Sequence, residues 1–273
     1  MSTLRDFLAR ATREGRISGR ELRTTAEHFG FSLRDTEEVA LELGIMPERY
    51  LRNADSISME AQLRLLQSTV AVVGCGGLGG YLVEELARLG VGTLVLFDPD
   101  VFEEHNLNRQ LLSDAATIGT PKIYAATRRI AAVNPAVQVR AHRASFSKSF
   151  GRNEIRGAQA AADALDSIPA RLELAAACGD LGIPLVHGSI AGWYGQVAVQ
   201  YPGEKIIETI FSGAQADRGV EARAGNPAFT PAVTASLQAA EICGMLLGRE
   251  SALRGKMLCI DLERMDFQSV EIG

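Results

Sequence analysis

A run of closely spaced glycines, VAVVGCGGLGG over residues 70–80, is the stretch of this sequence best suited to binding a phosphate. Gly74, Gly76 and Gly79 satisfy the spacing G-x-G-x-x-G, after an apolar β-branched segment and before leucines at helical spacing. Because glycine has no side chain, phosphate oxygens can approach the backbone N–H groups that open the helix. The spacing therefore predicts a nucleotide site, and a strand-to-helix turn without a ligand is the alternative.

The apolar segment that follows ends in acidic residues, FDPD. Asp98 stands where dinucleotide-binding folds place a carboxylate that accepts a ribose hydroxyl. ATP and NAD both contain a ribose, so the glycine loop and Asp98 leave both cofactors open.

Cationic residues further along favour a triphosphate over a nicotinamide ring. Arg109 lies in the polar segment HNLNRQ, and Lys122 lies at the start of a segment with helical periodicity. Arginine offers a bidentate fork to phosphoryl oxygens, and lysine offers a mobile point charge. Asp166 ends a later predicted strand, where a carboxylate can hold Mg²⁺ against phosphates. Together these residues predict a magnesium–nucleotide site at one edge of a sheet.

Alternating strands and helices must position these groups. Strands are predicted over residues 69–74, 93–100, 136–144, 158–167, 183–192 and 195–203 and twice within 256–272, and helices over 77–90, 120–135, 171–182 and 231–248. The alanine-rich segment 158–167 has a low strand propensity and is assigned from its place in the alternation. The pattern predicts an α/β, Rossmann-like, mainly parallel sheet with helices on both faces.

The first part of the chain has a different pattern. Residues 1–46 predict short helices, with Ser18 and Ser32 as N-caps and Gly30 near a helix end. We therefore expect a small helical appendage joined to a larger domain over residues 47–273.

Composition excludes several classes of partner. The net charge of −5 argues against a nucleic-acid-binding protein, and no apolar run is long enough to predict a membrane span. The N-terminus lacks the apolar core of a secretory signal. None of the four cysteines forms a C-x-x-C pair, which favours reduced thiols in a cytoplasmic protein.

From about Arg49 to Gly248 the chain resembles the ThiF/MoeB/HesA family, bacterial relatives of the ubiquitin-activating enzymes. The matching segments are RYLRN, the glycine loop, FDPD, NLNRQ, TPKIYAA, ALDSIPAR and the helix over 231–248. The resemblance implies that the protein binds Mg-ATP and adenylates the C-terminal glycine of a small ubiquitin-fold sulfur carrier protein ending in Gly-Gly. The carrier would be of the molybdopterin or thiamin type, and pyrophosphate would be released.

The resemblance also implies roles for matching residues. Those implied to contact ATP are Gly74, Gly76, Gly77 and Gly79 beside the phosphates, Asp98 at the ribose, and Asn106, Arg109 and Lys122 at the phosphates. Asp166 would hold Mg²⁺, and Arg52 would reach the partner's ATP across a homodimer interface. Arg109, Lys122, Asp166 and Arg52 would be the catalytic groups.

Two departures from the family pattern limit these expectations. Many members carry two C-x-x-C pairs that bind zinc, but this chain lacks them, so no structural zinc is expected. The crossover segment over residues 204–230 contains no cysteine, which favours adenylation without a covalent thiol intermediate. This segment could be a loop over the carrier's tail or a plain surface loop.

Three alternatives stay open. Some members adenylate a short peptide gripped by an N-terminal extension, and deletion of the appendage is expected to weaken carrier binding more than ATP binding. An NAD-dependent oxidoreductase would share the glycine loop and Asp98, although no catalytic His–Asp or Tyr–Lys pair stands out by spacing. A non-catalytic binding protein could keep the fold and use the appendage to dock a partner.

Overall fold

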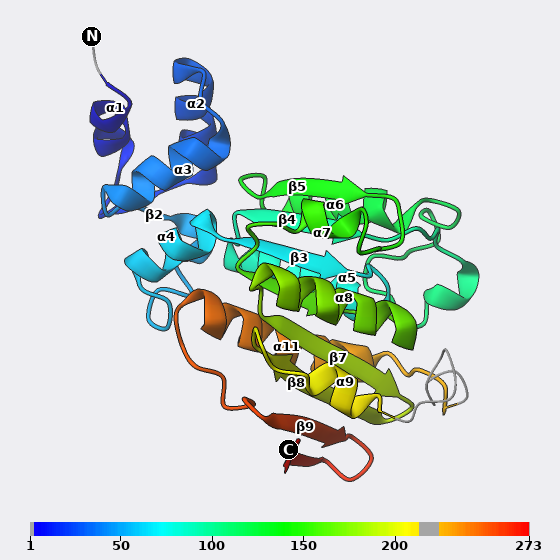
Figure 1. Ribbon diagram of the computed structural model, residues 1–273. Helices are drawn as coiled ribbons and strands as arrows, with labels where there is room; N and C mark the ends of the chain where they lie inside the picture. The colour runs from blue at the N-terminus through cyan, green and yellow to red at the C-terminus, as the bar shows by residue number, and fades with distance from the viewer. Residues whose placement is uncertain (1–2, 213–223, 273) are drawn as a thin grey trace.

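The computed structural model describes residues 3–212 and 224–272, and within these ranges an eight-stranded sheet forms the centre of the molecule (Figure 1). The strands are β3 (Thr69–Val73), β4 (Thr93–Phe97), β5 (Gln138–His142), β6 (Ala160–Asp163), β7 (Leu185–Ala191), β8 (Tyr194–Gln200), β9 (Lys256–Asp261) and β10 (Asp266–Glu271). Their order is β10-β9-β8-β7-β6-β3-β4-β5. The neighbours from β7 to β5 pair in parallel, whereas β8, β9 and β10 join in antiparallel pairs.

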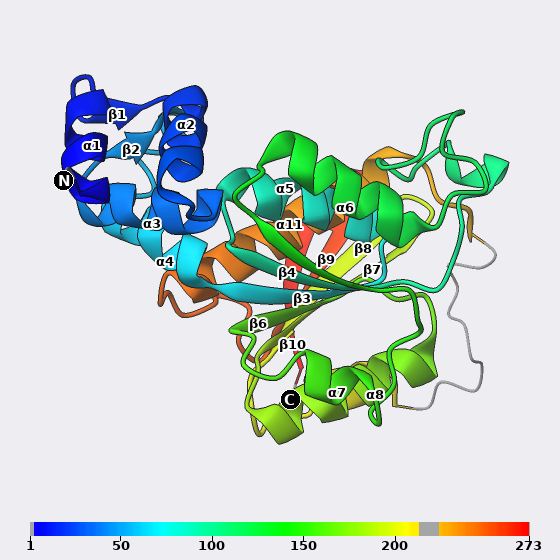
Figure 2. The same ribbon diagram turned by 90° about the horizontal axis from the view of Figure 1, so that it is seen from above.

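Helices cover both faces of the sheet, which confirms the predicted fold class (Figure 2). One face carries α5 (Gly77–Leu89), α6 (Lys122–Val133) and α11 (Phe229–Leu246), and the other carries α7 (Gly151–Glu154) and α8 (Ile168–Leu181). The short helix α9 (Ile206–Ile210) lies beside α8 and shares its apolar cluster (Figure 1). A separate apolar cluster fills the space between the sheet and each helical layer. Among the described residues no helix is both long and apolar enough to cross a bilayer.

The weakly predicted strand over residues 158–167 is confirmed as β6. Its alanines Ala160, Ala161 and Ala162 are fully buried between β3 and β7. Packing on both faces and hydrogen bonds on both edges stabilise β6 despite its low propensity, because strand propensity depends on tertiary context.

The N-terminal appendage contains α1 (Leu4–Ala11), α2 (Gly19–Phe29) and α3 (Leu33–Glu42), as predicted. Two short strands not expected from the sequence, β1 (Arg16–Ile17) and β2 (Met46–Pro47), pair in parallel and close the unit. The appendage has a small apolar core of its own. The proposed boundary at residue 46 therefore falls within this strand pair.

Hydrogen bonds attach the appendage to the amino ends of the strands. Arg34 donates to the Thr93 hydroxyl at the start of β4, over 2.8 Å, and to Gln138 at the start of β5, over 2.9 Å. The buried Glu37 carboxylate accepts a 2.8 Å hydrogen bond from the Tyr50 hydroxyl. Figure 2 shows the appendage at the opposite end of the sheet from the loop that joins β4 to α6.

Candidate nucleotide-binding site

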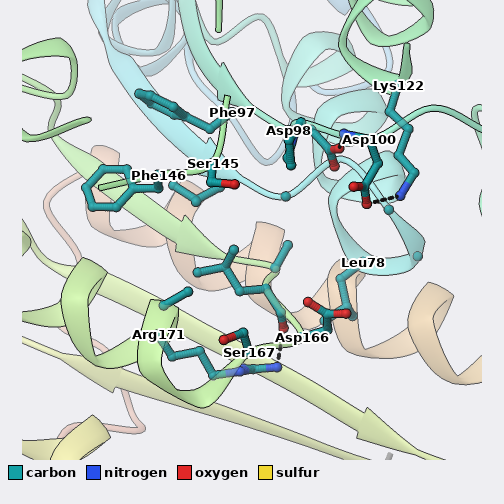
Figure 3. Close-up of a pocket in the computed structure, with 18 of the residues that line it drawn as sticks. Leu78, Phe97, Asp98, Asp100, Lys122, Ser145, Phe146, Asp166, Ser167 and Arg171 are labelled. Carbon is teal, nitrogen blue, oxygen red and sulfur yellow. Dashed lines mark hydrogen bonds and ion pairs between the residues drawn. The ribbon is translucent and has the colours of Figure 1, made fainter. Parts of the chain in front are cut away.

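A cavity of about 500 Å³ opens at the carboxyl ends of β3, β4 and β6 (Figure 3). Predicted site residues that line it are Gly74, Gly76, Gly77, Asp98, Arg109, Lys122 and Asp166. Crevices at this edge are where open parallel sheets bind ligands, because the loops there are free to diverge from the scaffold. The structure thus brings most of the predicted site together in one cavity.

The glycines of the loop serve two different purposes. Gly74 has a φ of +97°, and a Cβ there would lie 2.5 Å from the carbonyl oxygen of Ala164. Gly79 does not line the cavity; its missing side chain lets α5 approach β3, since a Cβ would lie 1.8 Å from the Gly74 carbonyl oxygen. Gly76 is the N-cap of α5, and because glycine has no side chain it cannot cap the helix. The backbone N–H groups at the helix start therefore remain available to an anion.

Asp98 at the end of β4 ties the glycine loop to the neighbouring strand. Its Oδ2 accepts a 2.7 Å hydrogen bond from the Cys75 N–H, and its Oδ1 accepts one of 2.9 Å from the Asp100 N–H. Burial raises the pKa of the Asp98 carboxyl, an effect that the Lys122 charge opposes. Asp98 therefore helps to fix the conformation of the glycine loop. Its contact with a ribose stays a prediction.

The Lys122 ammonium lies 2.9 Å from the Asp100 carboxylate, on the same side of the cavity as Asp98 (Figure 3). The lysine side chain is 9% exposed, whereas that of Asp100 is 63% exposed. A phosphate that enters the cavity would compete with Asp100 for Lys122. Because Asp100 is exposed, it can turn into solvent at little cost.

The segment after β4 supplies a second cation. Arg109 lines the cavity and donates from Nη1 to the His105 carbonyl oxygen over 3.0 Å and to Asn108 Oδ1 over 2.8 Å. Gln110, next in sequence, also lines the cavity with only 7% of its surface exposed. Its buried Oε1 has no hydrogen-bond partner among the described residues, so it could accept a bond from a ligand.

Asn106 has a structural contact instead of a place in the cavity wall. Its Oδ1 accepts a 3.0 Å hydrogen bond from the Glu103 N–H and closes the short helix η2 (Glu104–Asn106). Asn106 is 4% exposed and does not line the cavity, and its phosphate contact stays a prediction. Asn106 therefore supports the segment that carries Arg109.

Asp166 lies on the loop between β6 and α8, across the cavity from Asp98 and Lys122 (Figure 3). Next to this loop is a buried polar cluster that the sequence did not indicate, formed by Asp163, Arg171 and His187. Of these three residues, Arg171 also lines the cavity (Figure 3). These three residues come from β6, α8 and β7, so no spacing within one segment could have grouped them.

Comparisons with known proteins are consistent with this geometry. The model of the ThiF family matches residues 50–273. This chain belongs to the ThiF family. It is 37% identical over 227 residues to the "SAMP-activating enzyme E1" of Haloferax volcanii, covering 82% of this chain and 84% of that protein. It is 34% identical to the "Sulfur carrier protein adenylyltransferase" of Thermus thermophilus, with 82% and 87% coverage.

Some members of the family are longer than this chain. The alignment with the bovine "Adenylyltransferase and sulfurtransferase MOCS3", at 30% identity, covers 100% of this chain but 59% of that protein. Solved structures share the fold: PaaA has a TM-score of 0.68 at 23% identity and covers 94% of this chain and 75% of its own. Escherichia coli MccB with ATP has a TM-score of 0.69 at 20% identity, with 92% and 82% coverage.

Two parts of the family-based expectation remain, the role of Arg52 and that of the crossover segment. Arg52 is exposed in the turn between η1 (Glu48–Tyr50) and α4 (Met59–Gln67), and it does not line the cavity of its own chain. Of the expected crossover segment over residues 204–230, positions 213–223 lie outside the described residues.

Proposed function

We propose that this chain is an adenylyltransferase that uses ATP to activate the C-terminal glycine of a small ubiquitin-fold sulfur carrier protein, with release of pyrophosphate. The observation that carries the proposal is the placement of Arg109 and Lys122 on the wall of a glycine-lined cavity. Relatives that are aligned over most of their length are named as enzymes that activate such carriers. A carrier of the molybdopterin or thiamin type, ending in Gly-Gly, is the substrate that we propose.

The chemistry requires positioning and charge stabilisation more than proton transfer. A carboxylate is already ionised at neutral pH, so it attacks the α-phosphorus without a general base. Negative charge then builds on the phosphoryl oxygens and on the leaving pyrophosphate. Arg109 and Lys122 stabilise this charge in a partly enclosed cavity, where electrostatic interactions are stronger than in water.

The residues of the cavity fit Mg²⁺ held jointly with the nucleotide. Among the described residues no group of three or more His, Cys, Asp or Glu side chains could hold a metal by itself. Mg²⁺ is commonly bound through one or two carboxylates, substrate phosphates and waters, which a single residue such as Asp166 satisfies. When bound, the ion would neutralise phosphate charge, and Asp166 would orient it.

We further propose that the active form is a homodimer in the cytoplasm. Arg52 does not line the cavity of its own chain, and the turn that carries it precedes α4, which Figure 2 shows at the end of the sheet beside the appendage. Its family role therefore requires a second protomer. A cytoplasmic location agrees with four cysteines that are all unpaired among the described residues.

Exchange of labelled pyrophosphate into ATP tests the proposal. The assay contains the protein, Mg²⁺ and candidate carriers from the same cell, each also prepared without its last glycine. Exchange that requires the intact Gly-Gly carrier is the expected result. Absence of exchange with every carrier, together with saturable binding of NADH but not ATP, would refute the proposal in favour of an oxidoreductase.

A further inference from the structure

The buried cluster next to the Asp166 loop is an unusual feature of the molecule. Asp163 and His187 are 0% exposed and Arg171 is 2% exposed. Burial of charged groups costs free energy, and an apolar replacement of similar volume is often as stable. A contribution to stability is therefore a poor explanation of this cluster. Its hydrogen bonds indicate a second role, which is to hold the backbone next to Asp166.

Its contacts converge on the backbone of one residue, Leu165, which directly precedes Asp166. The Leu165 N–H donates to Asp163 Oδ1 over 3.0 Å, and the Leu165 carbonyl oxygen accepts a hydrogen bond from Arg171 Nη2. Arg171 Nη1 completes the connection by donating to Asp163 Oδ2 over 3.2 Å. Both polar groups of the residue that precedes Asp166 are thus held by side chains of the cluster.

His187 holds the other side of this arrangement. Its Nδ1 lies 2.6 Å from Asp163 Oδ2, a distance at which the nitrogen must donate to an ionised carboxylate. Its Nε2 lies 3.3 Å from Gln196 Nε2 and accepts from that amide. The same Nδ1 lies 3.0 Å from Arg171 Nη1, so the three side chains of the cluster meet at one point.

Among the described residues, an aromatic ring and a side-chain amide face the cluster from other elements. The Phe211 ring, after α9, lies 5.5 Å from the His187 ring and 5.6 Å from the Arg171 guanidinium. From α11, Gln238 Nε2 donates to the Asp163 carbonyl oxygen over 3.0 Å. Burial and the Asp163 charge also raise the pKa of the Cys178 thiol on α8. Of the described side chains, Arg171 and His187 are those that hydrogen-bond to Asp163, so its orientation depends on these two.

We propose that His187 and Arg171 are positioning residues for the magnesium–nucleotide site. His187 orients Asp163. Asp163 and Arg171 then fix the N–H and the carbonyl group of Leu165, and this backbone sets the direction in which Asp166 enters the cavity. The inference rests on the proposed function, because it assumes that Asp166 acts on the Mg²⁺ of bound Mg-ATP. Outer groups that orient a metal-binding carboxylate commonly affect metal affinity about 10–100-fold.

The test separates metal-dependent from metal-independent nucleotide binding. Isothermal titration calorimetry measures the Kd of ATP in EDTA and of Mg-ATP for the full chain and for His187→Leu, which fills the volume of the ring but cannot donate to Asp163. We expect the Kd of Mg-ATP to rise about tenfold or more while that of ATP in EDTA is unchanged. His187→Asn, whose amide can replace the Nδ1 donor, is expected to restore most of the Mg-ATP affinity.

Two further variants make the outcome decisive. Arg171→Lys keeps the charge beside Asp163 but cannot bridge to Leu165, so it should show the same selective loss even if His187→Leu fails to fold. Tyr50→Phe removes a buried hydroxyl from the hydrogen bonds at the other end of the sheet, and it should lower thermal stability without changing either Kd. Equal losses with and without Mg²⁺, or no loss in His187→Leu and Arg171→Lys, would overturn the inference. Failure of the wild-type chain to bind any adenine nucleotide would instead refute the proposed function.

Discussion

Gly79 offers the sharpest test of how the glycine loop is built. A Cβ at this position would lie 1.8 Å from the Gly74 carbonyl oxygen, whereas ordinary contact begins near 3.4 Å. The opposing atom is a backbone oxygen of the residue directly after β3, so either α5 or the glycine loop must move to make room for the Cβ. Overpacking costs about 1–3 kcal/mol, occasionally more, and alanine recovers only about 0.5–1 kcal/mol of this as a better helix former. We expect Gly79→Ala to lower the free energy of unfolding.

The neighbouring residue provides a matched control. At Gly80, the next position of the same helix, a Cβ would lie 3.4 Å from Leu112 Cγ, which is normal contact. Gly80→Ala should leave stability unchanged or raise it by up to about 1 kcal/mol. Urea unfolding followed by circular dichroism measures both variants, and pyrophosphate exchange should fall by up to about 100-fold in Gly79→Ala alone, as expected when a loop misplaces a substrate by an ångström. Equal stability and equal exchange in the two variants would refute this explanation of the motif.

Three other predictions follow from the site and the appendage. Arg109→Ala and Asp166→Ala should each lower pyrophosphate exchange about 10²–10³-fold with unchanged circular dichroism, and near-normal turnover would remove that residue from the mechanism. Although burial raises the pKa of Asp163, the Arg171 charge and the His187 hydrogen bond lower it below the usual value, so Asp163 contributes stability above about pH 4 that is lost as the pH falls through the lowered pKa. The urea midpoint should therefore drop less steeply below pH 4 in Asp163→Asn, and parallel curves would contradict this. Deletion of residues 1–46 removes Arg34 and Glu37 and should lower the melting temperature. The affinity for ATP should be unchanged, since the appendage lies at the far end of the sheet from the cavity. Weaker ATP binding would show that the appendage affects the cavity, and the carrier affinity of the same variant tests whether the appendage contacts the carrier.

Local chemistry explains why much of the site could be predicted. A glycine loop between a strand and a helix directs the N–H groups at the helix start toward a ligand. The residues that follow neighbouring parallel strands lie at the same edge of the sheet. The sequence therefore predicts that Gly74, Asp98, Lys122 and Asp166 lie near one another. All four line the same cavity, with Asp166 across from Asp98 and Lys122. Asn106 differs, because a side chain in a polar turn can close the turn itself instead of facing a ligand.

Pairing across the sheet could not be predicted in the same way. The final strands β9 and β10 were expected, but their antiparallel order next to β8 depends on which strand edges remain open after the parallel core has formed. The pairing of β1 with β2 joins residues 16 and 46, and a strand of two residues has no periodicity to detect.

Hydrophobic periodicity and the glycine spacing, both local properties of the chain, determined the α/β class, the place of the nucleotide loop and most of the residues at its rim. Only the tertiary structure decided that Asp163, Arg171 and His187 meet, that Lys122 pairs with Asp100, and that the appendage lies away from the cavity. The physical reason is range: backbone conformation responds to neighbours a few residues away, whereas a buried polar contact depends on how separate elements pack against one another.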